Sequence, residues 1–185
     1  MSGKGLTARV NRHLEEYLSE FVYGGIDGAV TTFAVVAGAT GARFDTKVLL
    51  VLGFANLIAD GFSMGVGSYL SKKSEQELMI KRGESANDLP SPVINGATTY
   101  LAFILVGLVP LLSYTFDTIF DAGISNLFLW ASVLTGLAFV GIGILKSRVA
   151  QTPLLRAILE TLILGAIAAS FAYVLGDLLE RLITG

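Results

Sequence analysis

Long apolar stretches alternate with short polar segments along most of the chain. Five of these stretches reach the ~20 residues that a membrane-spanning helix needs. They lie at about 21–42, 47–70, 93–116, 125–146 and 154–178. The pattern therefore predicts an all-α integral membrane protein with five transmembrane helices.

The segment before the first span has a different pattern. Its apolar residues recur at helical spacing between charged residues, and it lacks the apolar run of a signal peptide. This predicts an N-terminal amphipathic interfacial helix over residues 1–20, followed by a five-span transmembrane domain over residues 21–185. A soluble helix packed on the loops is the alternative.

Local signals mark several helix ends. Asp45 is placed to cap the second span, and Ser91 followed by Pro92 opens the third. Pro153 falls in the first turn of the fifth span. Pro110 lies inside the third span, where it predicts a kink because proline lacks a backbone donor.

Composition excludes several classes of function. The chain is 53% hydrophobic and only 15% charged, against about 25% charged in soluble domains. The net charge of −2 gives no reason to expect a nucleic-acid partner. With no cysteine and a single histidine, thiolate and histidine-rich metal sites are excluded. We see no nucleophile–base pair or phosphate-binding loop, so we do not expect an enzyme.

Basic residues predict the orientation. Ten of the 13 lie in the N-terminal segment, the 71–92 connection and the 147–153 turn with its flanks. The positive-inside rule then places the N-terminus in the cytoplasm and the C-terminus outside. The balanced charges of 71–92 indicate a solvated turn. The short chain and the lack of a targeting segment favour a prokaryotic cell membrane.

Two aspartates lie well inside the first two spans. Asp27 is in the first, where Thr31 shares its face, and Asp60 is in the second. A carboxylate within the bilayer costs about 2.5–3.5 kcal/mol on insertion scales. Chains that keep such groups aim them at a bundle interior or a water-filled path, so the pair indicates a cation pathway.

The second span adds further donors along one line. Asn56, Asp60 and Met64 follow at intervals of four, with Ser63 beside them. Carboxylate and amide oxygens with one thioether favour Fe²⁺, with Mn²⁺, Co²⁺ and Zn²⁺ as alternatives, over Mg²⁺ or Ca²⁺. A carboxylate in low dielectric also exchanges a proton for a metal ion.

We therefore predict a site for a transported divalent cation and no resident cofactor. The primary candidate ligands are Asp27, Met64, Asp60 and Asn56, and the secondary candidates are Ser63, Thr31 and Glu160. The alternative is that these side chains serve helix packing through hydrogen bonds. For Glu160, a salt bridge with Arg156 is favoured over a role in admitting cations.

Glycines recur on the same two spans. Gly24 and Gly28 are four residues apart, as are Gly61 and Gly65. This spacing puts both members of a pair on one face and lets helix backbones approach closely.

Three segments resemble the vacuolar iron transporter family. They are D-G-A-V-T-T-F-A-V-V-A-G-A from Asp27, N-L-I-A-D-G-F-S-M-G-V-G-S-Y-L-S from Asn56, and P-L-L-R-A-I-L-E-T-L-I-L-G-A-I-A-A-S-F-A-Y from Pro153. The resemblance implies a five-span homodimer that exports Fe²⁺, and often Mn²⁺, from the cytosol in exchange for protons. It also implies that Asp27 and Met64 line a path at the dimer interface, with Asp60 and Asn56 nearby.

One part of the chain departs from that family. Metal-storing members carry a long, Glu-rich cytoplasmic insertion between the second and third spans, whereas this connection has only about twenty residues. Ser68 also stands where members often have Glu or Asp. The resulting hypothesis is a proton-coupled exporter of Fe²⁺ or Mn²⁺ that lacks the cytoplasmic metal-binding domain. The alternative is a non-transporting membrane scaffold or metal-binding protein.

Overall fold

Helices and short turns make up all of the described residues, 3–83 and 90–184, in the computed structural model. In chain order the elements are α1 (Gly3–Gly41), α2 (Thr46–Lys81), α3 (Pro92–Gly107), the 3₁₀ turn η2 (Val109–Leu111), α4 (Leu112–Phe120), α5 (Leu127–Ala150) and α6 (Leu154–Thr184). Five stretches are long and apolar enough to cross a membrane, with α3 to α4 counted as one. The predicted all-α fold with five spans is confirmed.

Two helices extend beyond their predicted spans. α1 passes residue 20 without a break, since no glycine or proline interrupts the chain between residues 6 and 23. The placement of residues 1–20 flat on the membrane stays a prediction. α2 continues to Lys81, so the solvated turn predicted from residue 71 is wrong for residues 71–81. Its Lys, Glu and Gln residues are good helix formers, and Gly83 ends the helix with a φ of 75°.

The predicted helix ends and the predicted kink are confirmed. The side chain of Asp45 accepts a hydrogen bond of 2.8 Å from the backbone nitrogen of Lys47. Ser91 precedes Pro92 at the start of α3, and α6 begins directly after Pro153. At Pro110 the third span breaks into α3, η2 and α4, because proline cannot continue the helical hydrogen bonds.

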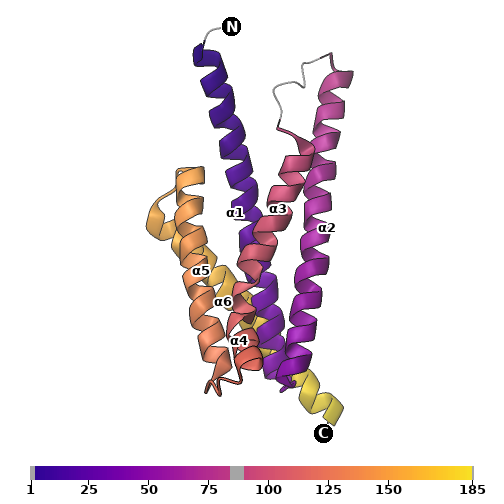
Figure 1. Cartoon of the computed structure of the whole chain (residues 1–185), viewed down its shortest axis with the longest axis vertical. Coiled ribbons are helices and arrows are strands. Elements are labelled where there is room, and N and C mark those ends of the chain that lie inside the picture. The colour runs from indigo at the N-terminus through magenta and orange to yellow at the C-terminus, as the bar shows by residue number, and fades with distance from the viewer. Residues whose placement is uncertain (1–2, 84–89, 185) are drawn as a thin grey trace.

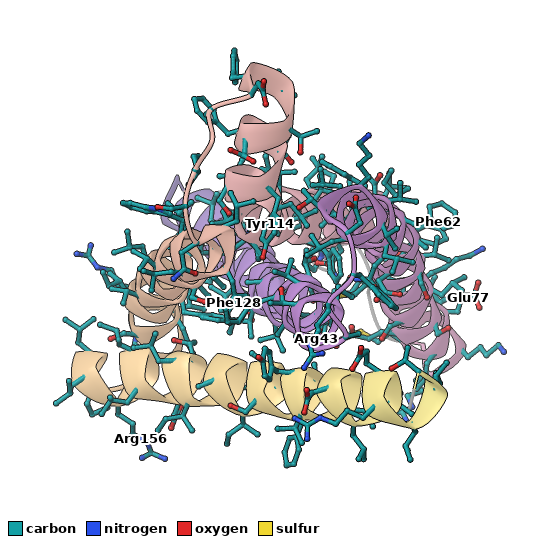
Figure 2. All side chains as sticks on the ribbon, turned by 90° about the horizontal axis from the view of Figure 1, so that it is seen from below. Arg43, Phe62, Glu77, Tyr114, Phe128 and Arg156 are labelled. Carbon is teal, nitrogen blue, oxygen red and sulfur yellow. The ribbon has the colours of Figure 1, made fainter. Side chains whose placement is uncertain are left out.

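α1 is the central helix of the bundle. It packs along α3 and α6 and also contacts α2 and α5 (Figure 1). α3 fits between α1 and α2, and α2 and α5 form opposite edges in this view. Seen from below, α6 runs along one side of the bundle, at a steep angle to the other helices (Figure 2). α2 therefore keeps one face on α3 and α1 and leaves the other face open.

Glycines bring the backbones of α1, α3 and α2 into contact. A Cβ atom at Gly24 would collide with the carbonyl oxygen of Thr99, and one at Gly28 with that of Phe103. Between α2 and α3, a Cβ at Gly65 would lie 3.0 Å from the carbonyl oxygen of Gly96. The close approach predicted from the glycine spacing is confirmed. The close packing of both helices against α3 determines the distance between α1 and α2.

We predict that Gly28→Ala weakens the fold. The added Cβ meets the backbone of Phe103, which has no rotamer to change, so α1 and α3 must separate at a cost of about 1–3 kcal/mol. Thermal unfolding in detergent, followed by loss of monodisperse protein, should occur at a lower temperature. Gly136→Ala is the matched control, because nothing lies within 4 Å of its Cβ position. Equal unfolding temperatures for Gly28→Ala and wild type would contradict this packing.

Candidate metal-binding site

The two intramembrane aspartates lie at about the same level of the seam between the antiparallel helices α1 and α2, as the Glu20–Ser68 and Glu16–Lys72 contacts place them. Asp27 is half-buried on α1, Asp60 is exposed on α2, and their carboxylates interact electrostatically. Asp27 directly precedes Gly28, whose contact with α3 holds this turn of α1 in place. Thr31 donates its hydroxyl to the backbone oxygen of Asp27 at 2.8 Å, which gives it a local role in its own helix.

The other predicted donors on α2 have different surroundings. Asn56 is half-buried, and its Nδ2 atom is buried with no hydrogen-bond partner among the described residues. Met64 packs partly against the apolar core, whereas Ser63 is exposed. The predicted line of donors along α2 therefore follows the border between its packed face and its open face.

The register of α1 and α2 places further polar groups along the same seam. Two contacts define it: Glu20 with Ser68, and Glu16 with Lys72. Since the helices are antiparallel, Met64 lies level with Tyr23, one turn from the aspartates. Polar side chains thus continue from the aspartates toward the end of the seam at Lys72.

A cavity of about 470 Å³ opens along this part of the seam. Its lining residues come from α1, α2 and α3: Glu20, Tyr23, Met64, Gly67, Ser68, Ser71, Lys72, Glu75 and Asn95. Unlike a lipid-facing groove, it is lined mainly by polar groups. It therefore connects the thioether of Met64 with a set of oxygen donors.

Glu20 holds the central position among these donors. Its Oε2 atom accepts hydrogen bonds from Ser68 at 3.0 Å and from Thr99 at 2.7 Å. Asn95 donates its Nδ2 to Ser68 at 3.1 Å, while the buried Oδ1 atom of Asn95 has no partner among the described residues. The cavity therefore contains a carboxylate, hydroxyls and an unused amide oxygen, all of which can bind a cation.

Sequence reasoning missed Glu20 because it assigned this residue to the surface helix. In the continuous helix α1, Glu20 lies seven residues before Asp27 and so on the same face. The seven-residue spacing on α1 could have identified Glu20. Ser68 could have been identified in the same way, because it continues the line of Asp60 and Met64 on α2. The contribution of Asn95 depends on the tertiary packing of α3 and has no comparable sequence signal.

An ion cluster lies at the end of the seam. The ammonium group of Lys72 is 3.4 Å from Glu16 on α1 and 2.9 Å from Glu75 on α2. Only 15% of the Lys72 side chain is exposed. Two acids against one base leave this end of the cavity negative, which favours cations over anions there.

Glu160 lies away from the seam, on α6. Its two oxygens accept hydrogen bonds from Lys146 at 2.7 Å and from Arg156 at 2.9 Å. The salt bridge favoured from the sequence is confirmed. With both oxygens engaged by cations, this side chain is not part of the site on α1 and α2.

The described residues of one chain offer few strong metal ligands at the level of the two aspartates. Within the described ranges, no three His, Asp or Glu side chains come together as a metal site. Asp27 and Asp60 contribute two carboxylates, supplemented by Met64 and Asn56. A divalent cation bound at this level therefore needs ligands from water or from a second protein copy.

Comparisons with known proteins agree with this architecture. The model of the VIT family matches residues 18–88 and 77–177. Vacuolar iron transporter homolog 4 of Arabidopsis thaliana is 28% identical over 165 residues, covering 85% of this chain and 81% of the relative. The vacuolar iron transporter of Toxoplasma gondii is 44% identical over 64 residues, covering 35% of this chain and 21% of the relative.

A third relative matches almost end to end. Vacuolar iron transporter 1 of Arabidopsis thaliana is 24% identical over 224 aligned positions, covering 90% of this chain and 87% of the relative. These relatives are named as transporters, in agreement with the expectation that the chain is not an enzyme. The family resemblance expected from the three sequence segments is confirmed by a match over most of the chain. The protein is a multi-pass membrane protein that belongs to the VIT family.

Proposed function

We propose that the chain exports a divalent metal ion, Fe²⁺ or Mn²⁺, from the cytosol by exchange for protons. The observation that carries the proposal is the row of donors on the seam of α1 and α2, from Glu20 past Met64 to Asp60 and Asp27. The names of the relatives support a metal as the transported ion, and the thioether favours a first-row transition metal.

Proton exchange follows from the cost of charge within a bilayer. Two empty, ionised aspartates inside the spans carry two negative charges that the lipid interior disfavours. Two protons neutralise them, and so does one divalent cation. The free-energy cost of placing this site in the bilayer is therefore lowest when it holds protons or a metal ion. Direct exchange of protons for the metal avoids the state in which both aspartates are ionised and empty.

A homodimer would complete the ligand set. On α2 the exposed Asp60 is accompanied by small or polar exposed residues at helical spacing: Ala55, Ala59, Ser63, Gly67 and Ser71. Lipid disfavours a carboxylate on such a face, and small residues allow a second helix to approach. A two-fold axis along this face would bring two copies of Asp27, Asp60 and Met64 toward one path.

The cavity supplies the approach to this path. With the predicted orientation, the end of the seam at Lys72 faces the cytosol. Glu16 and Glu75 attract the cation there, and Glu20 with Asn95 provides a first oxygen site before Met64. These side chains would load the metal in place of the long cytoplasmic insertion, because only a short connection joins the second and third spans of this chain. A prokaryotic cell membrane remains the proposed location, with the vacuolar membrane as the alternative.

We predict that Asp27→Asn abolishes coupled transport. In proteoliposomes with an imposed pH gradient, wild type should accumulate Mn²⁺ and release protons in the opposite direction, reported by a trapped pH dye. The amide keeps the shape but cannot exchange a proton, so uptake should fall about 10–100-fold or more. Asp121→Asn is the control, since it removes the same charge at an exposed turn whose left-handed backbone suits asparagine.

Three results would decide between the proposal and its alternatives. Wild-type uptake by Asp27→Asn would contradict the site assignment, and uptake without proton movement would contradict antiport. A scaffold in which the acids serve packing should show no uptake in wild type and no change in thermal unfolding when Mn²⁺ is added.

We predict that Glu20→Gln weakens the binding of the metal ion in the cavity more than it slows the passage of the ion across the membrane. The substitution keeps an acceptor for Ser68 and Thr99 but removes the charge that draws the cation to the cavity. The Mn²⁺ concentration for half-maximal uptake should rise severalfold, with a smaller change in the maximal rate. Glu15→Gln, at an exposed position on the same helix, should leave both unchanged. An unaltered concentration dependence for Glu20→Gln would remove this residue from the path.

A further inference from the structure

A second cavity, of about 540 Å³, lies between α1, α5 and α6 at the end of the bundle where α5 joins α6. It is lined by Ile26, Lys146, Glu160, Thr161, Ile163, Leu164 and Ile167. The residues Ile163, Leu164 and Ile167 are exposed on α6, so the apolar wall opens toward the lipid. The transport path described above does not use this cavity.

The rim of this cavity carries a compact charged cluster. Glu160 binds Lys146 through one carboxylate oxygen and Arg156 through the other. One acid thus gathers two bases and leaves the cluster with one net positive charge. The Nε atom of Arg156 makes the bond to Glu160, and the side chain is 73% exposed, so its remaining guanidinium donors face outward.

Helix geometry adds to the positive potential at this rim. α6 begins at Leu154, and the N-terminal end of a helix carries a partial positive charge. Arg148 lies in the last turn of α5 beside the same junction. An anionic group is therefore favoured here, and a divalent cation is not, since Glu160, the one carboxylate among the described lining residues, already binds two cations.

We propose that this cavity binds an anionic phospholipid. The phosphodiester would contact Arg156 and Lys146, and one acyl chain would lie against Ile163, Leu164 and Ile167. The single negative charge of the phosphodiester complements the single net charge of the cluster. A second copy of the chain is disfavoured at this rim because two positive clusters would meet. The proposal does not depend on metal transport.

The test is native mass spectrometry of the purified full chain supplied with equal amounts of phosphatidylglycerol and phosphatidylcholine of the same acyl chains. Wild type should retain phosphatidylglycerol preferentially. The double variant Lys146→Gln/Arg156→Gln should lose this preference. The ratio of retained phosphatidylglycerol to phosphatidylcholine should fall about fivefold for each base removed. Lys73→Gln/Lys81→Gln is the matched control, because it removes two exposed bases from α2 without touching the cavity.

Two further measurements separate lipid binding from misfolding and from binding of free phosphate. The triple variant that adds Glu160→Gln leaves no unpaired carboxylate, so it should fold as wild type does and show the same loss of preference. Excess inorganic phosphate should not displace the lipid, because it cannot replace the acyl chain. Equal retention of both lipids by wild type, equal loss in the control variant, or displacement by inorganic phosphate would each overturn the proposal.

Discussion

The contact between the backbones of α1 and α3 is the constraint on which the rest of the structure depends. At Gly24 and Gly28 the two helices approach so closely that no side chain fits between them. Because α3 also touches α2 through Gly65 and Gly96, one helix sets the separation of its two neighbours. That separation leaves α1 and α2 near enough for their acids to interact and far enough apart for a cavity to open between them.

The polar seam shows how a membrane protein can retain charge that its surroundings disfavour. Glu20 is stabilised by hydroxyl donors from Ser68 and Thr99, and Glu16 by the ammonium of Lys72. Asp60, deeper in the spans, is exposed on the open face of α2. The acids with protein partners thus lie nearer the end of the seam. In the proposed function, a metal ion or protons neutralise Asp60 and Asp27.

The fold was largely predictable because the bilayer imposes one strong requirement on length and hydropathy. Pro110, Asp45 and Ser91 act locally, so their effects could also be derived from the sequence. The extension of α2 was not predicted, because a charged segment can form a helix as readily as a turn.

The site was predictable only in part. Asp27 and Asp60 were proposed as candidates because they lie well inside the first two spans, and Met64 because it follows Asp60 by one helical turn. Glu20 was missed because a local amphipathic pattern cannot distinguish a face on the membrane surface from one that lies against another helix. Asn95 joins the cavity through the packing of α3, which no pattern within a single span specifies.

In the proposed transport mechanism, the intramembrane aspartates and Met64 of two copies meet around a divalent metal. Anomalous scattering from crystals soaked in Mn²⁺ would locate this metal. We expect a peak on the two-fold axis, within coordination distance of Asp27 or Asp60 and close to Met64. Manganese bound only at exposed acids outside the seam of α1 and α2, in crystals that contain the dimer, would contradict it.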